Sequence, residues 1–144
     1  MRLLKKVLWL IGENMIAIDT NILVRIVTND NPEQVQQTVK LLRNHPIFIS
    51  KTVILELEWV LRFSYDLNRT IIATTLQKIL TTDNFTIEQQ STLEQALQWY
   101  QQGMDFADAL HLASSLHADK FASFDKKLLK KATVLNTGIE IFEL

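Results

Sequence analysis

Short apolar segments that alternate with helical segments constrain the fold of this chain more than any other feature. Runs typical of buried strands occupy residues 15–18, 47–49, 85–87, 121–124 and 139–142. Helical periodicity and capping residues predict helices over residues 20–27, 31–44, 50–63, 70–80, 88–101, 105–117 and 126–132. This alternation is typical of a mostly parallel sheet covered by helices on both faces. We therefore predict an α/β fold with a central sheet of four to five short strands.

Composition limits the classes of function. The chain has 144 residues, enough for one domain with a sizeable core. It has no cysteine, which excludes disulfides and zinc–thiolate sites and favours a reducing, cytoplasmic setting. The formal net charge of −1 provides no global positive field for nucleic acid. No apolar window approaches the length of a membrane span, so we expect no membrane association.

The first fourteen residues differ from the rest of the chain. Cationic residues precede the apolar run 7–11, as in a signal peptide, but the run is too short and Gly12 interrupts it. We therefore interpret residues 1–14 as a flexible N-terminal extension or a mis-assigned start, with Met15 as the alternative first residue. Residues 15–144 form the predicted domain.

Four carboxylates adjoin these apolar segments: Asp19, Glu56, Asp108 and Asp125. Asp19 and Asp125 each follow an apolar run directly, at the strand end where parallel sheets place their ligand sites. Glu56 has apolar neighbours on both sides and is preferred over Glu58, which we interpret as a solvated surface charge. A pair of like charges at about 4 Å repels by roughly 4 kcal/mol at an effective dielectric near 20. Oxygen-only ligands favour Mg²⁺ or Mn²⁺, which would stabilise such a cluster.

Each of these residues also has a purely structural interpretation. Asp19, Asp105 and Asp125 stand where N-cap residues are common, and capping is the preferred interpretation of Asp105. His111, one turn after Asp108, is more typical of a structural histidine than of a site residue. The lysines of residues 126–131 form either a solvated helix face or a strip that holds an RNA backbone.

Four motifs in order support a family resemblance: Asp19-Thr20-Asn21, Leu55-Glu56-Leu57, the segment Phe106–Ala113 around Asp108, and Ser123-Phe124-Asp125. In these motifs the chain resembles a PIN domain, most closely the VapC-type toxins of bacterial toxin–antitoxin pairs, over residues 15–144. The resemblance implies a three-layer α/β/α fold and a Mg²⁺- or Mn²⁺-dependent endoribonuclease.

The same resemblance implies the roles of particular residues and partners. Asp19, Glu56, Asp108 and Asp125 would form the catalytic, metal-binding quartet, and Asn21, Asp105 and Ser123 would be supporting polar residues. Ser123 stands where threonine is more usual, which retains the hydroxyl. The implied partners are an RNA substrate, a cognate antitoxin protein and a second copy of the chain in a homodimer.

Two other functions remain open on the sequence alone. The first is a non-catalytic PIN-like module that binds RNA or protein. The second is a phosphoryl-transfer domain, either a haloacid-dehalogenase-like phosphatase or a receiver domain. The phosphatase pattern requires an aspartate where this chain has Asn21, and the acidic pair of a receiver is missing from the first strand. Trp59 and Trp99 suit either a dimer interface or the core.

Overall fold

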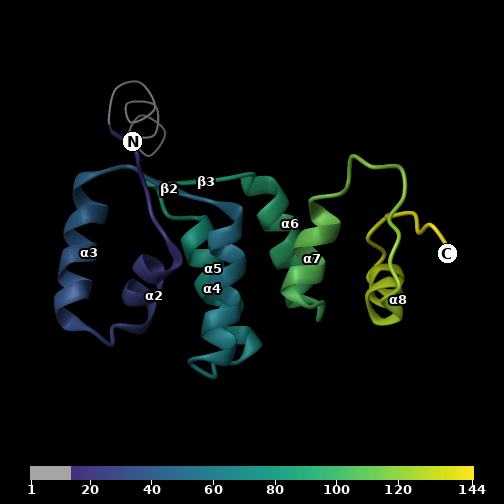
Figure 1. Ribbon diagram of the computed structural model, residues 1–144, viewed down its shortest axis with the longest axis horizontal. Coiled ribbons are helices and arrows are strands. Elements are labelled where there is room, and N and C mark those ends of the chain that lie inside the picture. The colour runs from purple at the N-terminus through teal and green to yellow at the C-terminus, as the bar shows by residue number, and fades with distance from the viewer. Residues whose placement is uncertain (1–13) are drawn as a thin grey trace. The chain divides into compact units, whose positions relative to one another are not determined.

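A computed structural model describes residues 14–144 (Figure 1). The predicted extension therefore lies outside the described residues, except for Asn14. The chain divides into two compact units, Met1–Gln90 and Ser91–Leu144. Each unit has its own set of buried apolar side chains.

Three parallel strands form the sheet of unit 1. They are β1 (Ile16–Ala17), β2 (Ile47–Ile49) and β3 (Phe85–Ile87), in the spatial order β1-β2-β3. Ile16 pairs with Ile47, and Ile47 pairs with Phe85, so all three strands begin at the same edge of the sheet. Their carboxyl ends therefore share the opposite edge, where Asp19 follows β1 and Ser50 follows β2.

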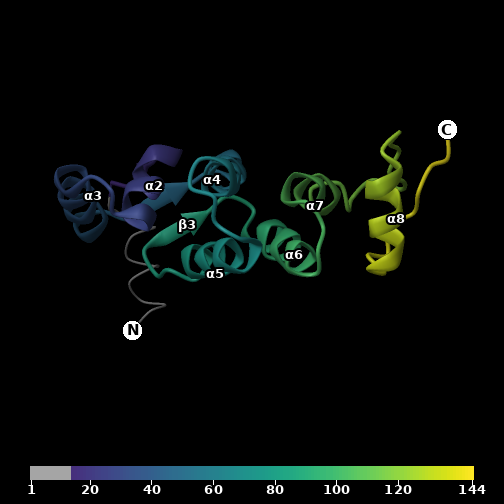
Figure 2. The same ribbon diagram turned by 90° about the horizontal axis from the view of Figure 1, so that it is seen from below.

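Four helices accompany this sheet: α2 (Thr20–Thr28), α3 (Pro32–Asn44), α4 (Lys51–Phe63) and α5 (Arg69–Leu80). The side chains of Asn31, Ser50 and Asn68 cap α3, α4 and α5, as the residue types at these positions favour. Figure 2 shows β3 between α4 and α5, and both views show α2 beside α3. Aliphatic residues from the strands and helices fill the core, with Ile47, Leu57, Leu61, Ile72 and Leu76 fully buried. The predicted α/β fold, with a parallel sheet inside helical layers, is confirmed.

Unit 2 is helical. It contains α6 (Gln90–Gln101) apart from its first residue, α7 (Phe106–Ala113) and α8 (Lys126–Val134). Gly103, at a φ of +106°, makes the turn after α6 in a conformation that favours glycine. The buried rings of Tyr100 and Phe106 meet edge to face across this turn, with their centroids 5.4 Å apart. Trp99 is also buried, which places it in the core.

The structure corrects two features of the predicted fold. The sheet has three strands in the described residues, not four to five, because segments 121–124 and 139–142 form only one parallel bridge, between Phe121 and Ile141. Helix α7 ends at Ala113, although the periodicity predicts a helix as far as His117. None of the helices within residues 14–144 has the length and apolar character needed to cross a membrane.

Candidate active site

Asp19 follows the β1 segment and caps helix α2. Its backbone is extended, and its Oδ1 accepts a hydrogen bond from the backbone N–H of Ile22 at 3.2 Å. Asp19 itself is thus the N-cap, because its carboxylate satisfies a free amide of the first helical turn. The side chain is exposed, and Oδ2 accepts no hydrogen bond from residues 14–144. Capping therefore fixes one oxygen and leaves the other available to a ligand.

Glu56 and Glu58 have opposite environments on helix α4. Glu56 is exposed, whereas Glu58 is 2% exposed and lies 2.9 Å from the Nε of Arg62, one turn later. The Nη2 of Arg62 also donates a hydrogen bond to Glu58 at 3.2 Å. The interpretation of Glu58 as a solvated surface charge was wrong, because the arginine at i+4 compensates the buried carboxylate. Glu56 forms no ion pair within residues 14–144 and is the accessible carboxylate of α4.

Asp105 and Asp108 occupy the first turn of α7 in unit 2. Asp105 caps the helix: its Oδ2 accepts a hydrogen bond from the backbone N–H of Asp108 at 3.2 Å. This confirms the predicted capping role of Asp105. Asp108 is half-buried, and His111 is exposed one turn further along the same helix. The cap therefore fixes the backbone that carries Asp108.

Ser123 and Asp125 form a second capping arrangement in unit 2. The Ser123 hydroxyl accepts a hydrogen bond from the Asp125 N–H at 2.9 Å, and Asp125 Oδ1 accepts one from the Leu128 N–H at 3.2 Å. Asp125 is thus the N-cap of α8, and the hydroxyl of Ser123 holds the backbone that precedes it. The supporting role expected for Ser123 has a structural basis in this hydrogen bond.

The pKa of Asp108 depends on the neighbouring charged groups of unit 2. Burial raises the pKa of Asp108, and the negative charges of Asp105 and Asp125 raise it further, while His111 acts in the opposite direction. A raised carboxyl pKa marks a place where negative charge lacks compensation. Asp108 therefore lies close enough to Asp105 and to Asp125 for their charges to act on it.

The donor set of this acidic group fits a hard divalent cation. Its side chains offer carboxylate oxygens and no sulfur, which is the ligand chemistry of Mg²⁺ and Mn²⁺. Bound positive charge would also relieve the repulsion that raises the pKa of Asp108. Within the described part of the chain, no three acidic or histidine side chains are gathered tightly enough to hold a metal ion.

A pocket of about 310 Å³ lies between α2 and α3 in unit 1, beside Asp19. We name it the amide pocket, because three of its six polar lining residues are asparagine or glutamine. Two aliphatic side chains line it together with Asp19, Asn21, Arg25, Gln34, Gln37 and Thr38. Of these, sequence reasoning identified only Asp19 and Asn21. The signal for the others was weak: Arg25 lies one turn after Asn21, and Gln34 and Thr38 share one face of α3.

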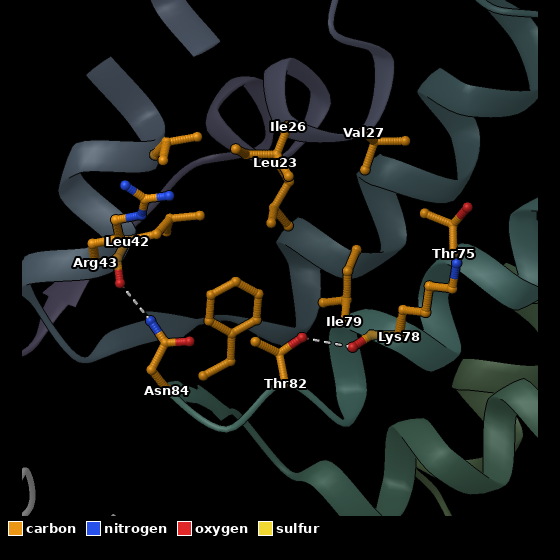
Figure 3. A pocket seen from close by; sticks show the side chains of 12 residues that line it. Leu23, Ile26, Val27, Leu42, Arg43, Thr75, Lys78, Ile79, Thr82 and Asn84 are labelled. Atoms are coloured by element: carbon orange, nitrogen blue, oxygen red, sulfur yellow. Dashed lines mark hydrogen bonds between the residues drawn. The ribbon is translucent and has the colours of Figure 1, made fainter. Parts of the chain in front are cut away.

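A second pocket, of about 590 Å³, is apolar and has no carboxylate in its lining (Figure 3). Leu23, Ile26 and Val27 of α2 face Ile79 of α5 across it. Asn84, at its margin, donates a hydrogen bond to the Leu42 carbonyl at 2.7 Å. Its residues Asn84 and Phe85 lie where β3 begins, whereas Asp19 follows the end of β1. This pocket therefore adjoins the edge of the sheet opposite to the edge that Asp19 follows.

The model of the PIN domain family matches residues 16–134, which include every residue predicted for the site. No curated protein matches the chain. The matched range begins at β1 and ends with α8, so it includes all the helices and strands described above.

Proposed function

Because this chain belongs to the PIN domain family, whose members are typically metal-dependent nucleases, we propose that it is a Mg²⁺- or Mn²⁺-dependent endoribonuclease. Asp19, Glu56, Asp108 and Asp125 are the proposed catalytic and metal-binding residues. The observation that carries the proposal is the PIN family match over residues 16–134, which include these four carboxylates. Burial and the charges of Asp105 and Asp125, which raise the pKa of Asp108, are consistent with it. A fold that needed only helix caps would not require a half-buried Asp108 near two further carboxylates.

In this proposal some polar side chains bind the metal ion and others position the residues that bind it. Asp19 and Asp125 each use Oδ1 to cap a helix, which fixes the orientation of the carboxylate and leaves Oδ2 to bind. Asp105 and Ser123 act as positioning residues, because they hydrogen-bond the backbone N–H groups of Asp108 and Asp125. A bound divalent cation would supply an activated water for attack on the RNA phosphodiester and charge stabilisation for the leaving oxygen.

We further propose that the chain is the toxin of a toxin–antitoxin pair, acts in the cytoplasm, forms a homodimer and is inhibited by a cognate antitoxin. The support is the set of VapC-like motifs in the sequence. An exposed aromatic pair supports an interface: Trp59 and Phe63 of α4 are 54% and 60% exposed, with ring centroids 5.1 Å apart. Large exposed aromatic side chains are enriched at protein–protein interfaces.

A non-catalytic PIN-like module is the second candidate function. It is favoured by the finding that, among residues 14–144, no three acidic or histidine side chains are gathered tightly enough for an ion. Such a module would bind RNA or protein with the same acidic residues in place and would release no cleaved product.

Cleavage of a mixed RNA pool tests the two functions. Wild type is compared with Asp108→Asn in Mg²⁺, in Mn²⁺ and in chelator. The control is Asp66→Asn, at an exposed residue with a φ of +52°, a conformation that asparagine also tolerates. We expect metal-dependent cleavage by wild type and the control, and at least about a 100-fold loss in Asp108→Asn. RNA binding without cleavage by folded wild type would instead establish the binding module.

A further inference from the structure

The amide pocket has the features of a built binding site next to Asp19. Helix α2 contributes Asn21 and Arg25, which are one turn apart, and α3 contributes Gln34, Gln37 and Thr38 from its facing side. Its volume of about 310 Å³ is at the lower end of the range for small-molecule sites. A site of this size accommodates one small planar group better than a long ligand.

A hydrogen-bond network fixes Arg25 at this pocket. Its Nε donates to Gln34 Oε1 at 2.6 Å, and its Nη1 donates to Asp30 Oδ1 at 2.7 Å. Asp30 is itself held by the hydroxyls of Thr28 and Tyr65. The guanidinium charge is therefore already compensated, and its plane is held in one orientation.

Thr38 provides an independent indication that the pocket receives a ligand. This residue is only 3% exposed and lines the pocket, yet its hydroxyl makes no hydrogen bond to any residue from 14 to 144. The hydroxyl oxygen is not sealed from solvent at the pocket wall, so a ligand group in the pocket can hydrogen-bond to it. The amides of Asn21 and Gln37 are also available, because neither makes a hydrogen bond within the described residues.

The charges of the pocket favour a neutral ligand over an anion. Asp19 contributes a carboxylate to the lining, and the Arg25 charge is paired with Asp30. A phosphate would meet a carboxylate and no free cation among these lining residues. A nucleobase, by contrast, presents adjacent donors and acceptors that amide side chains match, and its face stacks on a guanidinium plane.

We propose that the amide pocket binds one unpaired nucleobase of a single-stranded RNA, next to the phosphodiester that is cleaved. This inference rests on the proposed endoribonuclease function, because Asp19 belongs to both sites. The base would hydrogen-bond to Gln37 and Thr38 and lie against the fixed guanidinium of Arg25. The pocket thereby selects the nucleotide at one position beside the cut.

Abasic RNA substrates test this inference. An unstructured RNA that contains one mapped cleavage site is prepared with a single abasic nucleotide at each position around the cut. For wild type, we expect one abasic position to lower kcat/KM by about 10-fold or more, which is the range for losing one bound base. In Gln37→Leu and Thr38→Val, the same abasic position should change kcat/KM by less than about 2-fold, because the pocket no longer reads the base.

Gln36→Leu is the matched control, since Gln36 is on the same helix but does not line the amide pocket. It should retain the full abasic effect. An abasic effect of unchanged size in Gln37→Leu and Thr38→Val would overturn the inference. The inference would also be overturned if Gln37→Leu and Thr38→Val lost kcat/KM equally on the intact RNA and on every abasic RNA.

Failure of the proposed function gives a different result. If wild type cleaves no RNA, binding of short homopolymer RNAs and of an abasic strand of equal length is measured by fluorescence anisotropy. The base pocket would be supported, without catalysis, if wild type bound a homopolymer more tightly than the abasic strand. This difference should disappear in Gln37→Leu and remain in Gln36→Leu. Equal binding of the abasic strand would overturn it.

Discussion

The buried carboxylate of Glu58 lies 2.9 Å from the Nε of Arg62, one turn along helix α4. Two residues earlier, Glu56 is exposed on the same helix. This difference in burial gives the two glutamates different roles. Glu58 is buried in unit 1 and is paired with the partly exposed Arg62, while Glu56 remains accessible to an ion or substrate.

We expect Glu58→Gln and Glu56→Gln to have opposite effects. Glu58→Gln leaves Arg62 without its charged partner and should lower the free energy of unfolding by about 1–3 kcal/mol. Glu56→Gln changes an exposed side chain and should alter stability by less than about 0.5 kcal/mol, while reducing RNA cleavage. Urea denaturation and the cleavage assay measure both effects. A stable Glu58→Gln variant with lost cleavage would reverse the assignment.

Asp105 offers a test that separates a cap from a charge. Asparagine caps helices as well as aspartate does, so Asp105→Asn should keep the stability of the chain. It should also lower the pKa of Asp108, because it removes one of the negative charges that raise that pKa. Asp105→Ala loses the hydrogen bond to the Asp108 N–H and should cost about 1 kcal/mol.

Thermal unfolding and NMR titration of the Asp108 carboxyl distinguish these variants. An equal loss of stability in Asp105→Asn and Asp105→Ala would show that charge, not capping, is the contribution of Asp105 to the fold.

The sequence predicts the first half of the fold closely, for local reasons. The strands at 47–49 and 85–87 have the predicted bounds, and α3 begins at Pro32 after the cap Asn31. Apolar runs bounded by strong caps carry enough local information to locate an element. The predicted helix start at Glu88 is two residues early, because Gln89 has a φ of +50° and α6 begins at Gln90.

The strand predictions at 121–124 and 139–142 failed because periodicity does not determine pairing. Phe121 and Ile141 form a bridge, but Ser123 and Asp125 then hydrogen-bond to backbone amides at the start of α8. These local bonds replace a strand ladder. Helix α7 ends similarly early: Ser114 is its C-cap, and the Ser115 hydroxyl donates to the His111 carbonyl at 2.7 Å.

The sequence identified candidate residues of the site by their type and position, but not how deeply each side chain is buried or which side chains meet. The N-cap interpretations of Asp105 and Asp125 are confirmed, because residue type and position favour N-caps. Asp19 leads into a helix as predicted, but the cap of α2 is Asp19 itself and not Thr20 or Asn21, near which the sequence pattern predicted it. The burial of Glu58 was not predicted, since it depends on tertiary packing around Arg62. The amide pocket was also missed, because it requires side chains from two helices to meet. Its contacts join residues nine positions apart, such as Arg25 and Gln34.

The raised pKa of Asp108 predicts how stability depends on pH in metal-free protein. A carboxyl with a raised pKa binds its proton more tightly in the folded chain than in the unfolded chain. Its stabilising contribution is therefore complete below the unfolded pKa and is lost as pH rises through the folded pKa. Asp108→Asn removes the titrating group and should flatten this decline. Urea denaturation in chelator at a series of pH values measures it.

Added Mg²⁺ should restore stability to wild type at neutral pH, because an ion that binds only the folded chain shifts the equilibrium towards it. The effect should be much smaller in Asp108→Asn. An equal gain in both proteins would show that the ion binds elsewhere.

The hydroxyl of Tyr65, between α4 and α5, donates a hydrogen bond to Asp30 Oδ2 at 2.7 Å, in the turn between α2 and α3. This bond is the largest cause of the lowered pKa of Asp30, and Thr28 and Arg25 contribute in the same direction against the effect of burial. Tyr65→Phe should therefore raise the pKa of Asp30 towards its ordinary value, and Thr28→Val should raise it less.

The lowered pKa of Asp30 also affects stability. A carboxyl with a lowered pKa in the folded chain stabilises it above the unfolded pKa, and this stabilisation is lost as pH falls through the folded pKa. Tyr65→Phe should reduce that acid-side loss. NMR titration of the Asp30 carboxyl measures the shift, and an unchanged pKa in Tyr65→Phe would show that Thr28 and Arg25 hold the carboxylate without Tyr65.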